Sequence, residues 1–554
     1  MKIFLISFYL TLSFLVSIEA KSQHYIDSST TYLKGASNIF VSPGDTIYLR
    51  AGHKPFLLLE NIHGNADSMV VIINYGGKVI INTQNYYGIS TQNCTFFKIT
   101  GEGVNNISYG IDIEKVENGA GIGLSSLSNH FEICNLRIAN TLLAGIYAKS
   151  DPDTNFSSTR DSFLMEDIYI HHNLLMNIQD EGLYIGNTKY FGQHINYQGH
   201  DTLLLPHLLN NVDISFNEIH HTGWDAIQLS SASSNASIHD NKIYDDSYRD
   251  YPNQMSGIIL GGGTKANCYN NFISGGHGSG ILVVSLGGQK IYNNIILNAG
   301  KNYFPNNLSM MQYGIYVNDI SVEHDSSFYI FNNLIFNPKS DGIRFSSVLS
   351  KNNKIANNVI INPGNYWYYD TINTSFKSQD SYIMLTDNTI EIDTFKNIEQ
   401  LNSASLKFTD TLNHNFTLLS SSPLIDAGSN FGSFSINLDF YHNPRIHGLA
   451  VDIGPFEYNS LFQGITDEIN IKSLIIYPNP AHEVILIRNL NTTVNDTDIN
   501  VYGIDGKNIK MLLGKIKHIG NNEISIEITH LKKGYYFIQI DKTNTRFIGK
   551  FIVN

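Results

Sequence analysis

Cysteine is scarce in this sequence, since only Cys94, Cys134 and Cys268 occur among 554 residues. An odd number this small excludes a disulfide framework. All three lie in apolar, strand-like stretches, so we expect small buried core residues and neither metal ligands nor nucleophiles. None follows the apolar N-terminal stretch in a lipoprotein-like position, which argues against a lipid anchor.

Basic charge is also lacking, because 36 Lys and Arg face 49 Asp and Glu, a formal net charge of −13. An acidic chain without a basic run argues against general nucleic-acid binding. Beyond residues 1–20 no apolar stretch is long enough to span a membrane, so we expect no transmembrane segment. Residues 1–20 themselves combine Lys2, an apolar core and Ala20, which predicts a secretory signal peptide and hence an exported protein.

The sequence does contain a repeated six-residue motif, called here the first phrase. Eight times between residues 133 and 360 it reads as an apolar residue, two variable positions, an asparagine, one variable position and usually another apolar residue. The asparagines are Asn135, Asn173, Asn217, Asn241, Asn271, Asn294, Asn333 and Asn358. The shortest spacings, 23 to 25 residues, set a unit, and the longer spacings are that unit plus an insertion. Periods in this range predict a stacked solenoid.

A second phrase follows most of the asparagines, in segments such as AGIYA, EGLYI and SGIIL. Its apolar residues alternate with period two, which predicts short strands. The unit resembles one coil of a right-handed parallel β-helix of the pectate-lyase-like kind, over residues 40–460. The expected fold class is all-β, a right-handed parallel β-helix solenoid followed by a small C-terminal β-sandwich. Stacked coils would align the asparagines in a hydrogen-bonded ladder with a structural role.

The last segment has different features. Its stretches LIIYPNPAHEVILIRNL, INVYGIDGKNIK and LKKGYYFIQI alternate as strands, and Asp505-Gly506 predicts a hairpin turn. In this order they resemble the C-terminal sorting domain of proteins exported by the type IX secretion system, most specifically at Tyr477 to Pro480 and at Gly534 to Tyr536. The resemblance implies that the type IX secretion machinery is a partner. It also implies passage through the outer membrane to a secreted or cell-surface location.

These features divide the chain into segments. They are a signal peptide (1–20), an N-terminal cap with the first coils (21–92), parallel β-helix repeats (93–370), terminal coils with a closing segment (371–460), a linker (461–472) and the type IX sorting domain (473–554). In the closing segment, Asp439, Arg445, Asp452 and Glu457 fit the pattern of secreted β-helix proteins. We expect a charged network that caps the open end of the solenoid, with catalysis as the alternative.

Insertions indicate where function lies, because each coil is otherwise fixed and binding loops collect on one face. Residues 151–162 and 187–207 follow the strands of the second phrase, whereas residues 245–255 and 300–312 precede them. Walls on both sides of one row of strands predict a groove for an extended chain. Loop residues His194 and Arg249 are candidate substrate-binding groups.

The floor of this groove is predicted from the second phrase, whose central residue points outward. The outward row reads Tyr147, Tyr184, Gln228, Ile259, Leu282, Tyr316 and Arg344. Tyr147 and Tyr184 on adjacent coils would form an aromatic surface for sugar rings, with Gln228 beside them as a further substrate-binding group. The alternative is that exposed tyrosines simply favour strands.

Glu181 and Asp225 precede these strands at equivalent positions of successive coils. Two such carboxylates can share a proton, bind a hard cation such as Ca²⁺, or act as the acid and nucleophile of a glycosidase. The alternative is a pair of turn acids that satisfy backbone amides. Asp341 occupies the same position far from the insertions, which favours that alternative.

Histidine pairs at 171–172 and 220–221 do not share a row, so we expect no zinc site between them. His221 fills an ordinary polar turn position, yet it is near Asp225 in sequence and is a candidate base. The paired-aspartate motifs of polygalacturonases are missing, as is the lysine and arginine pattern of the alginate and chondroitin lyases.

The hypothesis is therefore a polysaccharide lyase or glycosidase whose candidate catalytic residues are Glu181, Asp225 and His221. No cofactor is indicated, and whether a metal binds stays open. The alternative is a non-catalytic surface adhesin or glycan-binding repeat protein.

Overall fold

The structure is a computed structural model that describes residues 21–303, 312–364, 367–369, 375–377, 380–430, 436–459, 470–488, 494–503, 508–510, 513–519, 523–542 and 545–553. The expected signal peptide and most of the expected linker lie outside the described residues. No described helix is long and apolar enough to cross a membrane. The described secondary structure is β-strands with two 3-10 turns, η1 (Ala404–Leu406) and η2 (Asp496–Asp498).

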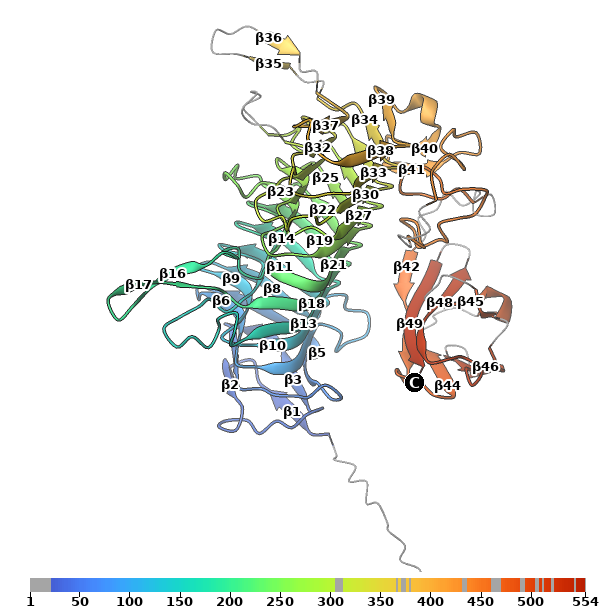
Figure 1. Cartoon of the computed structure of the whole chain (residues 1–554). Helices are drawn as coiled ribbons and strands as arrows, with labels where there is room; N and C mark the ends of the chain where they lie inside the picture. The colour runs from blue at the N-terminus through green and yellow to red at the C-terminus, as the bar shows by residue number, and fades with distance from the viewer. Residues whose placement is uncertain are drawn as a thin grey trace, which may run out of the picture.

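Stacked coils form the solenoid that runs through most of Figure 1. One face is a 12-stranded parallel sheet, called here the groove sheet. Its strands are β2 (Tyr32–Lys34), β4 (Leu57–Glu60), β6 (Tyr87–Gln92), β9 (Ala120–Ser125), β12 (Ile146–Ala148), β15 (Leu183–Ile185), β20 (Ile227–Leu229), β23 (Ser256–Leu260), β26 (Ser279–Val283), β29 (Ile315–Val317), β32 (Ile343–Phe345) and β37 (Ile383–Leu385).

The other two faces belong to a 23-stranded sheet in which two parallel rows run side by side. The first row is β1 (Gln23–Ile26), β3 (Thr46–Lys54), β5 (Val70–Thr83), β7 (Thr95–Thr100), β10 (Asn129–Cys134), β13 (Leu164–His171), β18 (Leu208–Ser215), β21 (Ala232–His239), β24 (Ala266–Tyr269), β27 (Gln289–Tyr292), β30 (Phe328–Phe331), β33 (Asn353–Ala356) and β38 (Ile392–Phe395). The second row continues from β3 and β5 through β8 (Ile111–Val116), β11 (Leu136–Thr141), β14 (Leu174–Ile178), β19 (Glu218–Thr222), β22 (Lys242–Tyr244), β25 (Phe272–Ser274), β28 (Ile295–Leu297), β31 (Leu334–Phe336), β34 (Val359–Ile361) and β39 (Ile398–Gln400).

Apolar side chains from all three faces fill the interior. In β12 the outer residues Ile146 and Ala148 are fully buried, whereas Tyr147 between them is half-buried on the outer surface. Ile146 stacks on Leu183 of the next coil and Leu183 on Ile227, so like residues form continuous columns. Burying one such side chain contributes about 1.5–3 kcal/mol. The three cysteines are buried, as expected.

The asparagine ladder is confirmed at the turn between the two rows. Asn241 is fully buried, and its Nδ2 donates to Ile214 O at 2.9 Å and to Asn271 Oδ1 at 3.0 Å. Its Oδ1 accepts from Asn217 Nδ2 at 3.0 Å. The ladder runs through Asn173, Asn217, Asn241, Asn271, Asn294, Asn333, Asn358 and Asn397. Each amide therefore satisfies backbone groups of its own turn and of its neighbours.

One expected member does not belong to the ladder. Asn135 has φ +59° and lies at the left-handed position that precedes the ladder, like His172 in the next coil. Leu136 takes the ladder position instead, and its backbone N–H donates to Asn173 Oδ1 at 3.1 Å. The spacing of ICNLRI differs from that of the other copies by one residue, which explains the shift.

The closing segment lies along the outer wall of the solenoid (Figure 1). Here β40 (Phe408–Asp410) and β41 (Asn415–Leu418) bring Phe416 and Leu418 against Leu334 and other residues of the second row. A row of turn asparagines then binds its backbone, for example through Asn293 Nδ2 to Leu438 O at 2.8 Å.

The charged residues of this segment are buried and bind mainly backbone atoms. Asp439 accepts N–H groups of Tyr441 and Glu457, and the guanidinium of Arg445 donates to Asp452 O and Gly454 O. The segment reaches back to Asp240, whose Oδ1 is 2.8 Å from His442 Nε2. The network therefore fastens the segment to the side of the solenoid, and we find it there and not across the solenoid's end.

The C-terminal region is a small β-sandwich with its own core, as expected. One sheet contains β42 (Asn470–Ser473), β49 (Thr545–Val553), β48 (Gly534–Lys542) and β45 (Ile499–Gly503). The other contains β43 (Ile475–Tyr477), β44 (Val484–Arg488), β47 (Glu523–Glu527) and β46 (Ile516–Ile519). Ile485, Ile526, Ile538 and Phe551 are among the side chains buried between them.

Besides β40 and β41, two further antiparallel hairpins stand apart from the larger sheets. They are β16 (Gln193–Tyr197) with β17 (His200–Leu204), which projects from the side of the solenoid in Figure 1, and β35 (Trp367–Tyr369) with β36 (Ser375–Lys377).

Candidate functional site

The outward row of the groove sheet has the register expected from the sequence. Tyr147 pairs with Tyr184, Tyr184 with Gln228, and Gln228 with Ile259. Both tyrosines are half-buried, and a Cβ on Gly123 would lie 2.8 Å from the Tyr147 hydroxyl. The Tyr147 ring therefore lies flat against the preceding coil and needs a residue without a side chain beneath it.

Gln228 differs from the tyrosines because only 1% of it is exposed. Its Nε2 is buried without a hydrogen-bond partner. The outward row is therefore buried at Gln228, where an exposed side chain was expected. An unpartnered buried amide is costly unless something else supplies an acceptor.

Lys149 adds a positive charge to the floor. Its ammonium lies 4.8 Å from the centroid of the Tyr184 ring and 3.0 Å from Asp151 Oδ1. Burial opposes its charged form, but the neighbouring Tyr184 and Asp151 raise the pKa of Lys149 overall.

Glu181 and Asp225 occupy equivalent positions on adjacent coils, as the spacing predicts. The backbone N–H of Gly182 donates to Asp225 O, and the N–H of Ala226 donates to Ser256 O, which fixes the order Glu181, Asp225, Ser256. Asp225 is fully buried and Glu181 is 2% exposed. Because neighbouring strands are about 4.8 Å apart, the two carboxyl groups are neighbours on one surface.

Asp341 has the same position further along but a different environment. Arg344 Nη1 donates to its Oδ2 at 3.0 Å, and the backbone N–H of Ser381 donates to its Oδ1 at 2.9 Å. Asp341 is therefore a paired turn acid. Asp225 is not, because both of its carboxyl oxygens are buried without a hydrogen-bond partner.

Burial and mutual repulsion change the acidity of this pair. Burial raises the pKa of Glu181 to about 7, helped by the negative charge of Asp180 and opposed by Lys149. Burial also raises the pKa of Asp225 well above its usual range, and the charges of Glu181 and Asp246 raise it further. The Ser256 hydroxyl partly offsets this rise. Two close buried carboxyl groups of this kind hold at least one proton at neutral pH.

The 245–255 loop is the segment expected to form one wall of the groove. Arg249 Nη1 donates to Asp180 Oδ1 at 3.2 Å and to Gln179 O at 3.1 Å. The Trp224 indole stacks on Tyr251 with ring centroids 4.7 Å apart. This loop therefore binds to the turn that carries Asp180 and Glu181.

The 151–162 and 187–207 loops, which were expected to form the opposite wall, are hydrogen-bonded to each other. The N–H of Arg160 donates to Leu205 O at 2.9 Å, and the N–H of His207 donates to Ser158 O at 3.2 Å. Tyr190 from this wall packs over Gly263 of the groove sheet's following turn. In the fourth insertion, residues 304–311 lie outside the described residues.

Neither of the two candidate histidines joins the carboxyl pair. His221 is exposed at a left-handed turn position, φ +60°, and stacks on Tyr248 with ring centroids 4.6 Å apart. Among described residues it makes no hydrogen bond or ion pair with Glu181 or Asp225. His194 projects on the β16 hairpin, where its Nδ1 is 2.8 Å from Asp201 Oδ2.

Four buried polar groups around β20 and the turns beside it were not among the candidates expected from the sequence. They are Trp224 Nε1, Ser230 Oγ, Ser256 Oγ and the Asp246 carboxyl group, and the first three lack a hydrogen-bond partner. Aligning SGIIL with DAIQL would have placed Ser256 next to Asp225. The position of Asp246 depends on the fold of its loop, so no sequence pattern reveals it.

The one metal-like cluster in the described part of the chain is elsewhere. Glu132, Cys134 and His171 bring ligand atoms together on β10 and β13 of the larger sheet. Lys98 Nζ already lies 2.8 Å from Glu132 Oε1, and burial raises the pKa of the Cys134 thiol to about 12. A lysine with its own positive charge and a neutral thiol make this a poor metal site. No described third histidine, cysteine or acidic ligand groups with Glu181 and Asp225, so Ca²⁺ binding there stays a prediction.

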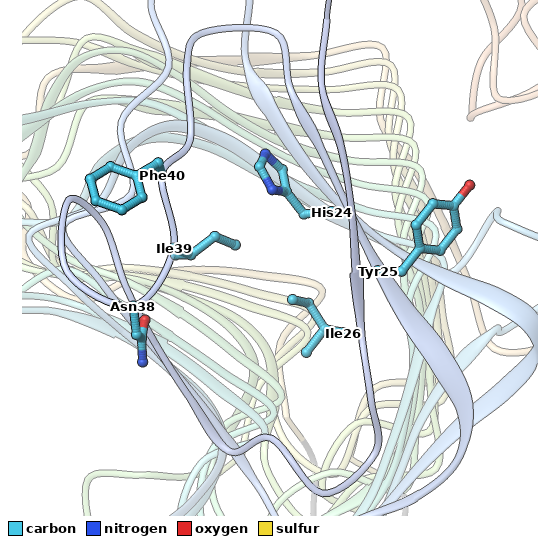
Figure 2. Close-up of a pocket in the computed structure, with 6 residues that line it drawn as sticks. All are labelled: His24, Tyr25, Ile26, Asn38, Ile39 and Phe40. Carbon is cyan, nitrogen blue, oxygen red and sulfur yellow. The ribbon is translucent and has the colours of Figure 1, made fainter.

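A shallow pocket lies at the N-terminal end of the solenoid, lined by His24, Tyr25, Ile26, Asn38, Ile39 and Phe40 (Figure 2). His24 is the titratable histidine there, and its Nε2 is 3.1 Å from Asp45 Oδ2. The pocket is formed by the first coil and contains none of the groove residues.

Comparison with known protein families gives two matches. The right-handed beta helix region matches residues 207–390, and the secretion system C-terminal sorting domain matches residues 475–554. The expected handedness and the expected type IX sorting segment are thereby confirmed. The sorting domain directs the protein to the cell surface or the extracellular space. The comparison with curated proteins gives no match.

Several solved structures share the general form at low similarity. Pectate lyase Pel9A is 12% identical, with 80% of this chain and 98% of that chain covered and a TM-score of 0.38. The GH136 lacto-N-biosidase from Eubacterium ramulus is 12% identical, with 69% and 68% covered and a TM-score of 0.36. The A-module of the Azotobacter vinelandii mannuronan C-5 epimerase AlgE6 is 12% identical, with 64% and 91% covered and a TM-score of 0.36. Similarity this low carries no argument about chemistry.

Proposed function

Because the chain is a right-handed β-helix that carries a type IX sorting domain, we propose that it is an exported glycoside hydrolase acting on a polysaccharide. The observation that carries the proposal is the pair of buried carboxyl groups, Glu181 and Asp225, on adjacent coils of the groove sheet. Two carboxyl groups about 5 Å apart are the catalytic unit of retaining glycosidases. A structural pair of turn acids would have hydrogen-bond partners, and Asp225 has none.

In this mechanism Glu181 is the general acid. Its pKa of about 7 leaves about half of these groups protonated at neutral pH, so Glu181 can donate a proton to the glycosidic oxygen as the bond from C1 to that oxygen breaks. Asp225 has to ionise for the next step, and this requires the site to open, because burial is the main cause of its raised pKa and repulsion by Glu181 is a smaller one. An oxygen of Asp225 then bonds to C1. Water, deprotonated by Glu181, releases the sugar and restores both groups.

The neighbouring side chains are proposed to bind the sugar chain. Tyr147 and Tyr184 provide ring surfaces for stacking, and Gln228 supplies a free amide donor. Arg249 acts indirectly, since it holds Asp180 beside the general acid. His221 and His194 have no role in this mechanism. Because both carboxyl groups are covered, the 245–255 loop has to open for the substrate to reach them.

Lys149 favours a polysaccharide lyase as a second candidate function. Its ammonium lies on the floor beside Tyr184 and near enough to Glu181 to lower the pKa of that carboxyl group. A lyase needs a positive charge at the substrate carboxylate and leaves an unsaturated sugar end, whereas a hydrolase leaves a saturated one.

The test is incubation of residues 21–554 with a panel of neutral and uronic-acid polysaccharides, following reducing ends and unsaturated-product absorbance. We expect new reducing ends without that absorbance. We also expect Glu181→Gln or Asp225→Asn to lower the rate by about 10²–10⁴-fold. Asp341→Asn is the matched control because it changes the same turn position outside the groove, and it should keep near-normal activity. Unsaturated products would favour the lyase, and binding without products would favour an adhesin.

A further inference from the structure

The polar groups around the carboxyl pair have unfilled hydrogen-bonding capacity. Gln228 Nε2 and Trp224 Nε1 are buried donors without acceptors. The Ser256 hydroxyl is buried with only Asp225 near enough to bind, and the unpartnered Ser230 hydroxyl lies at the far end of β20. Both Asp225 oxygens lack partners as well. Gln228, Ser230 and Ser256 are each at most 1% exposed. Buried polar atoms are almost always paired, so this cluster indicates a site that a hydroxyl-rich ligand completes.

The cations nearest to the carboxyl pair are held by other groups of the protein. Lys149 is paired with Asp151 at 3.0 Å, and Arg249 is paired with Asp180 at 3.2 Å. On the opposite wall the guanidinium of Arg160 is held by Tyr190 O and Pro206 O. Lys189 is exposed in the 187–207 loop. The two cations that lie against the pair, Lys149 and Arg249, are therefore each already held by an aspartate.

Negative charge, in contrast, is concentrated there. Asp180 and Asp246 lie beside the pair of Glu181 and Asp225, and all four residues are less than a tenth exposed. Asp246 accepts from the Ser247 hydroxyl at 2.9 Å, and its charge acts on Asp225. Each added anion in this buried region would repel these carboxyl groups and would keep the pair protonated.

From these observations we infer that the groove at Glu181 and Asp225 takes an uncharged glycan and discriminates against polyuronates. The inference rests on the proposed function, because it names the substrate class of the same site. Neutral sugar hydroxyl groups both donate and accept, so they match the free amide, indole and hydroxyl groups. A uronate carboxylate accepts only, and it would face the acidic residues while the nearest cations, Lys149 and Arg249, are already paired.

A matched pair of polymers tests the inference. A polyuronate and its carboxyl-reduced, neutral counterpart have the same linkage and differ in charge. Retention of residues 21–554 in gels containing each polymer, at low salt, measures binding, and reducing ends measure cleavage. We expect at least about tenfold stronger retention and faster cleavage with neutral polymers. Several such pairs with different linkages are used, so that linkage specificity is separated from charge.

A charge-reducing variant gives an independent readout. Asp246→Asn removes one anion beside Asp225 and should narrow the preference for the neutral polymer, while the exposed Asp67→Asn should leave it unchanged. Equal or stronger retention of polyuronates, or no retention of any neutral polymer, would overturn the inference. Cleavage of polyuronates that depends on Glu181 and Asp225 would sink the inference and keep the hydrolase. Binding of neutral polymers without cleavage would support the inferred ligand class and contradict the proposed hydrolase.

Discussion

Two carboxyl groups, Glu181 and Asp225, are held where the folded protein disfavours their charge. Asp225 is fully buried without hydrogen-bond partners, and Glu181 is 2% exposed. Such an arrangement lowers stability, and strained or unsatisfied groups tend to be retained where they serve a reaction. The pair is therefore better explained by chemistry than by folding.

The raised pKa of Glu181 should make the free energy of unfolding depend on pH. The pKa of Glu181 is raised from 4.5 to about 7, so at pH below 4.5 both folded and unfolded states are protonated. As pH rises from 4.5 towards 7, the unfolded state releases its proton first, and the free energy of unfolding falls before it levels off. Glu181→Gln should remove this loss. Between pH 4 and pH 8 the free energy of unfolding of the variant should therefore rise by up to about 3 kcal/mol relative to that of wild type.

Urea unfolding of wild type and variant across this pH range measures the difference. Asp67→Asn is the control, because Asp67 is exposed and its replacement should give a curve parallel to wild type. A Glu181→Gln difference that stays constant with pH would show that the raised pKa is wrong.

Several site residues could be predicted from the sequence, and the reason is register. The second phrase fixes which residues align on adjacent coils, so the pairing of Tyr147 with Tyr184 and of Glu181 with Asp225 follows from spacing. The environment of each residue does not follow. Gln228 is covered and Arg249 is paired with Asp180 because loops from distant coils fold over the sheet, and their packing leaves no periodic signal.

At the scale of elements, ion pairs between histidines and aspartates bind the closing segment to the side of the solenoid. His239 Nε2 lies 3.0 Å from Asp213 and its Nδ1 lies 2.7 Å from Asp240, while His442 reaches the other oxygen of Asp240. Burial opposes the charge of His239, but the hydrogen bonds to both aspartates raise its pKa to about 9. Burial also opposes the charge of His442, but Asp240 raises its pKa, and the two histidines together bridge the segment to the wall through Asp240.

His442→Gln should loosen the closing segment and leave the coils intact. The variant loses the ion pair with Asp240, so amide hydrogen exchange in residues 436–459 should accelerate by about tenfold or more. His447→Gln is the matched control, because His447 is an exposed histidine of the same segment. Unchanged exchange in 436–459 would mean that the apolar contacts of Phe416 and Leu424 suffice to hold the segment.

The closing segment also marks a limit of sequence reasoning. Its charged residues were expected to cap the end of the solenoid, because an exposed terminal coil needs cover. Asn293, Asn332 and Asn357 instead bind its backbone along the side. These asparagines look like ordinary turn residues in the sequence, and only the folded wall reveals that they form a row of donors.

The whole molecule consists of two regions with separate cores. The solenoid core contains residues such as Ile47 and Ile360, whereas the sandwich core contains Ile485 and Phe551, and no buried residue belongs to both. The fold of both was predictable, because repeats and strand alternation are local in sequence. Separate cores indicate that the solenoid folds without the sorting domain.

A chain that ends at residue 459 should retain the solenoid's thermal transition within a few degrees of its midpoint in the full chain. Calorimetry of residues 21–459 and of residues 21–554 measures this, and the longer chain should show additional heat from the sandwich. Loss of far-ultraviolet β-sheet signal in the shorter chain would contradict the separation.

The central claim is hydrolysis at Glu181 and Asp225, and digestion of a neutral polysaccharide in water enriched in heavy oxygen tests it most directly. We predict that mass spectrometry finds one heavy oxygen at each new reducing end. The labelled product should fall by about 10²-fold or more with Glu181→Gln and with Asp225→Asn, and persist with Asp341→Asn. Unlabelled, unsaturated ends, or labelled ends that survive both substitutions, would contradict the account.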